Sequence, residues 1–173
     1  GTMLSPAMIT ELRRRCGDYD IIHIHHPDPM AALALRLSGY KGRVILHWHS
    51  DILKQKFLLK FYLPVQNWLI DRAEKIVGTT LHYIRNSPFL TGRESKFERL
   101  LIGIDQVVPD TEGVAAIKTR YPGKRIIFSL GRLVEYKGFR HLVSAAEFIP
   151  DDYVLLIGGT GPLHDGLTAL IRE

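Results

Sequence analysis

The sequence predicts an α/β protein made of parts of two parallel-sheet domains, truncated at both ends. Short runs rich in Ile and Val alternate with helical segments along the whole chain, which is the pattern of βαβ units. The strand runs are almost continuously apolar, as in parallel strands that helices cover on both faces. A polar stretch at residues 105–111, which contains Pro109 and Asp110, separates the two parts and is interpreted as a linker.

Residues 1–104 are expected to form the C-terminal half of a first domain. The helices show apolar residues at helical spacing, and the strands are short β-branched or aromatic runs. Breaks at Pro27-Asp28-Pro29 and at Gly39 separate the first elements. In chain order we expect a helix at 4–15, a strand at 20–25, a helix at 30–37, a strand at 43–48, a helix at 57–73, a strand at 75–79, a helix at 81–86 and a strand at 97–102.

Residues 112–173 are expected to form the N-terminal half of a second domain. Pro122-Gly123 ends its first helix. The expected elements are a helix at 112–121, a strand at 124–130, a helix at 138–148, a strand at 153–157 and a helix from 163. Two parallel strands do not make a stable sheet of this type, and we therefore expect either that the chain is cut at both ends or that it borrows strands from a partner.

Composition narrows the class of protein. The apolar fraction of 46% is ample for a core, and no apolar run approaches the length of about 18 residues that a membrane span needs. The single cysteine, Cys16, excludes an internal disulfide framework and fits a reducing compartment. A net charge of +5 favours anionic partners such as phosphates, nucleotides, acidic lipids or nucleic acid.

The loop at residues 129–138 has the strongest chemical pattern. It follows a strand, and ligands of open parallel sheets bind beyond the carboxyl ends of strands. Gly131 lets a phosphate approach its backbone N–H, Arg132 offers a bidentate fork, and Lys137 adds a second charge. Gly138 begins a helix whose dipole favours an anion. The pattern predicts a diphosphate site rather than a solvated turn.

A second strand-to-helix loop, Gly158–Leu163, follows the next strand of the same sheet. Its glycines permit close approach of the backbone to a ligand, and Pro162 suits a first helical turn. The loop lacks the Gly-Lys-Ser/Thr ending of a P-loop. Together the two loops are interpreted as a nucleotide-diphosphate cradle.

Histidines end two strands in the first part of the chain. His49 could hydrogen-bond a phosphate or a sugar hydroxyl, or move a proton. Alternation places Trp48 on one side of its strand and His47 and His49 on the other. The five histidines His23, His25, His26, His47 and His49 lie at the ends of two strands that are interpreted as neighbours, so that two histidines from each strand could converge on a metal ion. No Cys pair accompanies them, and no metal is assigned.

The apolar and basic segment Leu53–Trp68 has two interpretations. It can be a buried core helix with a lysine rim, or a face that docks on an anionic membrane. Apolar residues surround the helix and Pro64 interrupts it, which favours the core.

Five motifs in this order resemble the retaining glycosyltransferases of family four, the group 1 enzymes with the GT-B fold of two Rossmann-like domains. The motifs are DIIHIHHPDP (20–29), HSD (49–51), LIGID (101–105), SLGRLVEYKG (129–138) and GGTGP (158–162). The resemblance covers nearly the whole chain, and the 129–138 loop is its most specific part.

The resemblance implies four groups of site residues. They are a donor diphosphate clamp of Gly131, Arg132, Lys137 and Gly138; a nucleotide-side loop of Gly159, Thr160 and Gly161; a catalytic His49 that faces the donor sugar; and an acceptor-side loop with His25, His26 and Asp28. The family's glycine-rich turn does not precede Asp20, and its glutamate pair does not occur before Glu173. This chain alone is therefore expected to be inactive.

The resemblance predicts an enzyme that moves a hexose from a UDP- or GDP-sugar to a glycan or lipid-linked acceptor with retention, in lipopolysaccharide, capsule or other cell-surface glycan synthesis. We expect no cofactor and no nucleic-acid partner. The expected location is the cytoplasm, with peripheral contact at the inner face of the cytoplasmic membrane. One alternative is a sugar-nucleotide epimerase of the same fold, whose catalytic carboxylates this segment does not show. Another is a non-catalytic basic binding module, which the scattered positive charge disfavours.

Overall fold

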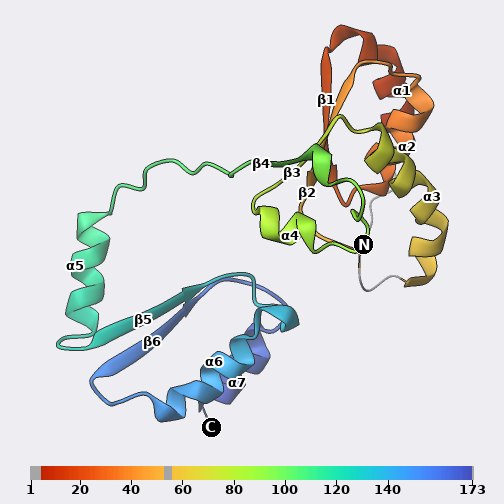
Figure 1. Ribbon diagram of the computed structural model, residues 1–173. Coiled ribbons are helices and arrows are strands. Elements are labelled where there is room, and N and C mark those ends of the chain that lie inside the picture. Colours follow the sequence, from red (N-terminus) through yellow and green to blue (C-terminus); the bar gives the residue numbers. More distant parts are fainter. Residues whose placement is uncertain (1–4, 53–55, 173) are drawn as a thin grey trace. The chain divides into compact units, whose positions relative to one another are not determined.

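The computed structural model describes residues 5–52 and 56–172 (Figure 1). The chain divides into two compact units, residues 1–105 and residues 106–173. Each unit has a parallel sheet of its own, as the alternation of strands and helices predicts. The α/β class with parallel sheets is thus confirmed.

The first unit contains a four-stranded parallel sheet in the order β1-β2-β3-β4. Its strands are β1 (Ile21–His26), β2 (Arg43–Trp48), β3 (Lys75–Gly78) and β4 (Phe97–Arg99). Its helices are α1 (Ala7–Arg15), α2 (Pro29–Ser38), α3 (Lys56–Arg72) and α4 (Leu81–Arg85), with short 3-10 turns η1 (Cys16–Asp18) and η2 (Glu94–Lys96). Gly39 ends α2 in the left-handed conformation, at φ 78°.

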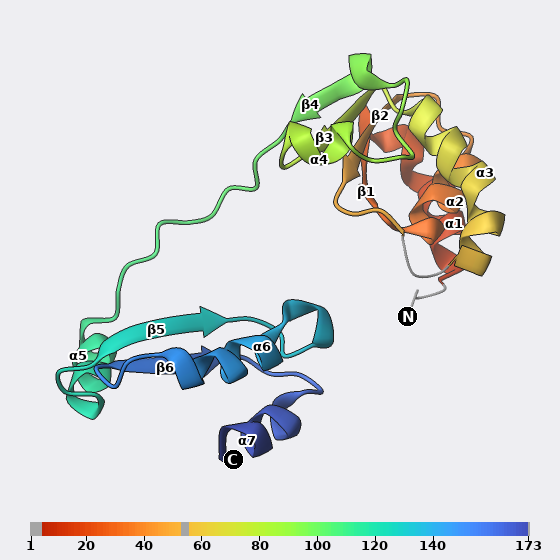
Figure 2. The same ribbon diagram turned by 60° about the horizontal axis from the view of Figure 1, so that its bottom comes forward.

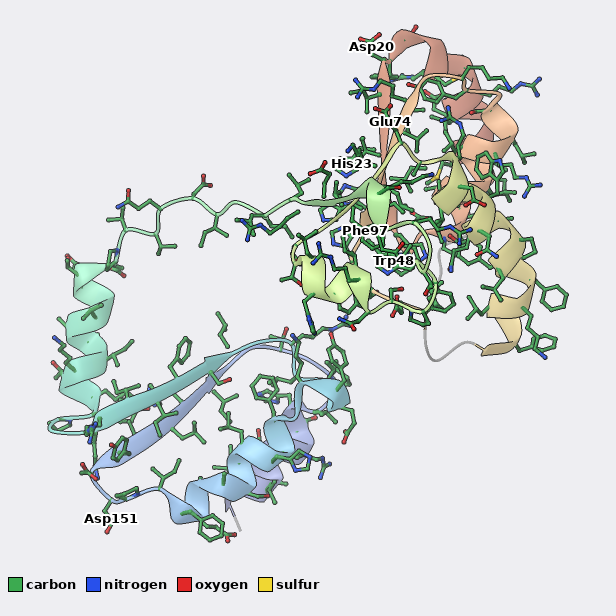
Figure 3. All side chains as sticks on the ribbon, viewed as in Figure 1. Asp20, His23, Trp48, Glu74, Phe97 and Asp151 are labelled. Atoms are coloured by element: carbon green, nitrogen blue, oxygen red, sulfur yellow. The ribbon has the colours of Figure 1, made fainter. Side chains whose placement is uncertain are left out.

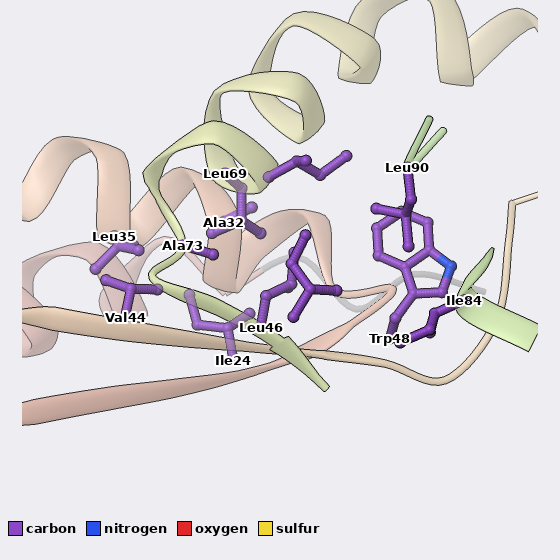
Figure 4. Packing of buried hydrophobic residues seen from close by; sticks show 12 residues of the cluster. Ile24, Ala32, Leu35, Val44, Leu46, Trp48, Leu69, Ala73, Ile84 and Leu90 are labelled. Atoms are coloured by element: carbon purple, nitrogen blue, oxygen red, sulfur yellow. The ribbon is translucent and has the colours of Figure 1, made fainter. Parts of the chain in front are cut away.

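Helices α1, α2 and α3 lie on one face of this sheet, as both views show (Figures 1 and 2). Even-numbered side chains of β1 and β2 point to that face because side chains alternate along a strand. Ile24, Val44 and Leu46 are buried there against α2 and α3. Trp48 packs between Ile84 and Leu90 at the end of β2 (Figure 4).

The opposite face of the sheet carries odd-numbered side chains, and among the described residues no helix covers it. Ile21, His23 and His25 are exposed on β1. Strands in the sequential order β1-β2-β3-β4 with right-handed crossovers place all connecting helices on the same side. The expectation of strands covered on both faces is therefore wrong for the described part of this unit.

The sequence predicted that Pro64 interrupts the helix, but α3 continues through this residue. Its second half is core, since Gln66, Leu69 and Ile70 are fully buried. Its first half is different: Phe57 and Phe61 are 72% and 71% exposed. Part of the Leu53–Trp68 segment, residues 53–55, lies outside the described residues. Among the described helices, none combines the length and the apolar character needed to cross a bilayer.

The second unit contains the parallel pair β5 (Arg125–Leu130) and β6 (Tyr153–Gly158). Helix α5 (Thr111–Arg120) precedes β5; α6 (Phe139–Ser144), which runs on into the 3-10 turn η4 (Ala145–Phe148), connects the strands; and α7 (His164–Arg172) follows β6. A further 3-10 turn, η3 (Glu135–Lys137), lies in the loop after β5. Helices α6 and α7 lie below the strand pair in the view of Figure 1.

Two predicted elements are shorter than expected. The strand expected at 97–102 ends at Arg99, and residues 100–110 form no helix or strand. The helix expected at 138–148 is α-helical only to Ser144. Pro150 restricts Ile149 to extended backbone, and the turn before it tightens to 3-10 geometry.

Candidate functional site

The two strand-to-helix loops of the second unit are joined through their backbones. Gly131 donates its N–H to the carbonyl of Gly158 at 3.0 Å, which extends the β5–β6 ladder by one bond. Leu133 then donates to the carbonyl of Thr160 at 2.9 Å, and Leu163 donates to the carbonyl of Leu133 at 3.1 Å. The 129–138 and 158–163 loops thus form one folded surface.

Close approach of these backbones explains the glycines of the second loop. A Cβ on Gly159 would lie 1.9 Å from the carbonyl oxygen of Gly131, and a Cβ on Gly161 would lie 2.4 Å from that of Leu133. Both distances are too short for any side chain. From the sequence we expected these glycines to let a ligand approach the backbone closely. In the structure, the backbone of the first loop occupies that space.

Two buried side chains fix the first loop. Leu133 and Phe139 belong to the small core of the unit together with Val143 and Leu167. Arg132 directly precedes the first anchor, and Lys137 stands two residues before the second. Both cationic side chains are exposed, and within the described part of the chain neither forms an ion pair with a carboxylate. Lys137 Nζ lies 5.5 Å from the centre of the Tyr136 ring.

Gly131 does not have the role that the sequence predicted for its backbone N–H. The backbone N–H of Gly131 was expected to meet a phosphate, but it is occupied by the carbonyl of Gly158. Gly131 is needed for packing instead, since a Cβ there would lie 3.3 Å from the Phe139 ring. Gly138 is the N-cap of α6, with φ 72°, in the left-handed region that favours glycine, and the helix itself begins one residue later than predicted. The loop therefore presents two exposed cationic side chains, those of Arg132 and Lys137.

In the first unit, His49 lies just beyond the end of β2, and its side chain is exposed. Its Nε2 is 2.7 Å from Nδ1 of His25, the register neighbour of His47 on β1. The sequence expected these two strands to be neighbours, and they are. Partial burial, then the nearby His25, lowers the pKa of His49.

The backbone after His49 is held at several points. His49 donates its N–H to the carbonyl of His26 at 3.1 Å. Asp51 Oδ1 accepts from Trp48 Nε1 at 2.8 Å and from Ser87 Oγ at 2.7 Å, and the Asp51 N–H donates to the Tyr83 hydroxyl at 3.0 Å. The strand end that carries His49 is thus fixed by α4 and the segment after it.

The sequence predicted His26 on an acceptor-side loop, but the structure places it elsewhere. It is the last residue of β1, is 1% exposed and stacks on Trp48 with ring centroids 3.7 Å apart. Its Nδ1 lies 3.2 Å from the Ser50 carbonyl and its Nε2 lies 3.2 Å from the Gln66 amide. Burial lowers the pKa of His26 to about 4. His26 therefore supports the loop after His49 and is not available to an acceptor.

Gln66 is a site residue that sequence reasoning missed. A neutral imidazole has one N–H, so the two contacts of His26 are compatible when its Nδ1–H donates to Ser50 and Gln66 presents its amide nitrogen to Nε2. The signal was a lone glutamine among buried positions of α3, at helical spacing from Leu69 and Ile70. Nearby, burial raises the pKa of Tyr62.

Asp28, also predicted on the acceptor side, caps a helix. Its Oδ1 accepts from the Ala31 N–H at 3.0 Å, which satisfies a free donor in the first turn of α2. Of the three predicted acceptor-side residues, only His25 keeps an exposed side chain free of such a structural task.

Four imidazoles stack along β1 and β2, on the face without helices. Ring centroids are 4.8 Å apart for His23 and His25, 5.2 Å for His25 and His47, and 4.0 Å for His47 and His49. Figure 3 labels His23 and, on the core side, Trp48. His47 is 4% exposed and neither ring nitrogen has a partner among the described residues, an arrangement that costs about 1–3 kcal/mol per buried group. Burial, then His49, lowers its pKa to about 4.

The fold defines the class of protein. It matches the crystal structure of Anabaena HepE in complex with UDP and glucose with a TM-score of 0.70 and 16% identity, over 95% of this chain and 46% of that one. This is the GT-B glycosyltransferase fold. The match concerns the fold alone, because the sequence identity is low.

Sequence comparison identifies the family. Residues 2–85 match the model of Glycosyltransferase Family 4. The chain is 28% identical to the D-rhamnosyltransferase WbpZ of Pseudomonas aeruginosa over 171 residues, and 33% identical to the O-antigen chain mannosyltransferase C of Escherichia coli over 151 residues. The two matches include 97% and 85% of this chain, but only 44% and 39% of the relatives' own lengths. The chain is thus a group 1 glycosyltransferase sequence that spans less than half the length of these relatives.

Proposed function

We propose that the whole protein transfers a hexose from a UDP- or GDP-sugar to a hydroxyl acceptor, with retention, in the synthesis of a cell-surface glycan. The observation that carries this proposal is the joined loop pair of the second unit, which presents Arg132 and Lys137 without carboxylate partners among the described residues. The family match and the sugar-transferring relatives support the same reaction class.

The chemistry requires stabilisation of negative charge as the diphosphate leaves and the sugar becomes oxocarbenium-like. Arg132 donates a bidentate pair of hydrogen bonds to phosphate oxygens, and Lys137 adds a point charge. Fixed donors aimed at developing charge are worth a few kcal/mol each. Gly159, Thr160 and Gly161 hold the loop that faces the nucleotide.

In the first unit, His49 positions the donor sugar through a ring nitrogen, and His25 orients that ring from 2.7 Å. The acceptor is proposed to be a glycan or a lipid-linked sugar. A lipid-linked acceptor agrees with Phe57 and Phe61 on α3, which are exposed, edge-to-face at 5.4 Å, and flank the exposed Lys60. We propose this end of α3 as a peripheral contact with anionic lipid at the inner face of the cytoplasmic membrane.

A transfer assay on the whole protein tests the proposal. Nucleoside diphosphate release should require both a sugar nucleotide and an acceptor. Arg132→Ala should lower kcat by about 10²–10³, the effect of losing one oxyanion donor, while Arg120→Ala on α5 should leave it unchanged. A changed sugar nucleotide formed without acceptor would instead indicate an epimerase. Salt-sensitive DNA binding without any response to sugar nucleotides would indicate a basic binding module.

A further inference from the structure

The face of the first sheet that no described helix covers carries a cluster of histidines. His23 and His25 stand two residues apart on β1, so their side chains point to the same face. His47 is the register partner of His25 on β2 and points to that face as well. One ring nitrogen from each of the three lies within 4.8 Å of the other two.

We propose that His23, His25 and His47 bind a divalent transition-metal ion of the kind that prefers imidazole, with Zn²⁺ as the reference ion. Three histidines and one open position form a common zinc ligand set. Tetrahedral bonds of about 2.0–2.1 Å place ligand nitrogens roughly 3.4 Å apart, so nitrogens that now lie within 4.8 Å of one another need to approach by up to about 1.4 Å. The proposal requires the exposed rings of His23 and His25 to turn toward the buried ring of His47.

His47 gives independent support for a ligand. Its side chain is buried, both of its ring nitrogens lie within the protein surface, and neither meets a donor or an acceptor among the described residues. Buried polar groups are ordinarily paired, and an exception requires a reason. A metal ion between β1 and β2 supplies the missing partner.

His49 completes the arrangement without binding the ion. Its Nε2 contacts Nδ1 of His25, which leaves the other nitrogen of His25 for the metal. Metal-bound histidines usually have such a partner on the second ring nitrogen, which fixes the orientation of the ring. The site would clip β1 to β2 and stabilise the first unit. It needs no donor sugar and does not rest on the proposed function.

Titration of the tag-free, EDTA-treated and dialysed chain with Zn²⁺ by calorimetry tests the proposal, and Co²⁺ absorption reports the geometry. We expect one ion per chain and a tetrahedral Co²⁺ spectrum. His23→Ala removes a proposed ligand with an exposed side chain and should weaken Zn²⁺ binding by at least about tenfold, the lower end of what loss of an outer-shell partner alone costs. The triple variant His82→Ala, His141→Ala, His164→Ala is the matched control and should bind as the original chain does.

Two results would overturn the proposal: absence of stoichiometric Zn²⁺ binding, or equal affinity in the His23→Ala variant and the control. Thermal unfolding gives a second readout. Zn²⁺ should raise the melting temperature of the original chain and of the control, and should raise that of His23→Ala less.

Discussion

A Cβ on Gly159 would lie 1.9 Å from the carbonyl oxygen of Gly131. This contact joins the first loop after β5 to the first loop after β6, and three backbone hydrogen bonds continue the connection. Neither loop can take its shape without the other. The cationic residues Arg132 and Lys137 therefore depend on a glycine that follows the next strand.

Replacing that glycine should disturb both loops. Gly159→Ala places a methyl group against backbone, which cannot move aside cheaply, and should lower the free energy of unfolding by about 2 kcal/mol or more, as overpacking and strain of this kind do. Urea denaturation measures the effect. Gly103→Ala, where a Cβ meets nothing within 4 Å, is the control and should change little. Equal stability of the two variants would show that the loops do not pack as described.

Asp51 should contribute to the stability of the first unit. Asp51→Ala removes the acceptor of the Trp48 indole N–H and of the Ser87 hydroxyl. Leaving a buried donor without a partner costs about 1–3 kcal/mol, which we expect in urea denaturation followed by tryptophan fluorescence. Asp20→Ala, at an exposed position before β1, serves as the control. A loss no larger than that of the control would contradict the assigned hydrogen bonds.

The strands that sequence predicted well are those with long β-branched runs. Strand β2 has the predicted bounds, and β1 is shifted by one residue. Strand β4 is shorter than predicted because its partner β3 ends at Gly78, whose register partner is Arg99. Leu100 still donates its N–H to the carbonyl of Gly78 at 3.0 Å, and beyond it Leu101 and Ile102 have strand propensity but β3 offers no further residue to pair with. Pairing partners are a tertiary property that local sequence does not record.

The candidate site residues likewise divide into those whose place the sequence predicted and those whose role depends on tertiary contacts. The chain position of the Arg132 loop and the proximity of His49 to the β1 histidines followed from strand order and alternation. The tasks of His26, Gln66 and Asp28 did not, because each depends on what lies opposite in the folded unit. The packing role of Gly159 and Gly161 likewise appears only when both loops are placed.

Residues 100–110 should be the place where protease separates the two units. They form no helix or strand, and Ile104, Val107 and Val108 are 80–89% exposed. Thermolysin, which cuts before large apolar residues, should cleave there first, and mass spectrometry should find two stable fragments. Trypsin is the matched control because the segment has no Lys or Arg. First cleavage inside either sheet would contradict the division.

The exposed end of α3 should bind anionic lipid. Phe57→Ala with Phe61→Ala removes two exposed rings and should reduce co-sedimentation with phosphatidylglycerol vesicles by at least about tenfold in partition coefficient, since each ring contributes on the order of 1 kcal/mol or more. Phe148→Ala in the second unit, at a ring that is 86% exposed, is the control. Unchanged sedimentation of the double variant would contradict the proposed contact of α3 with lipid.

Binding of nucleoside diphosphate to the loop pair is the central claim, and amide NMR titration of the chain with UDP and GDP tests it most directly. We predict shifts confined to residues 131–138 and 159–161, and an affinity that falls about ten- to hundredfold in Arg132→Ala, the scale of one charge-assisted hydrogen bond pair, but not in Arg120→Ala. Amides of these two loops that do not move with either nucleotide, or that move equally in Arg132→Ala, would contradict it.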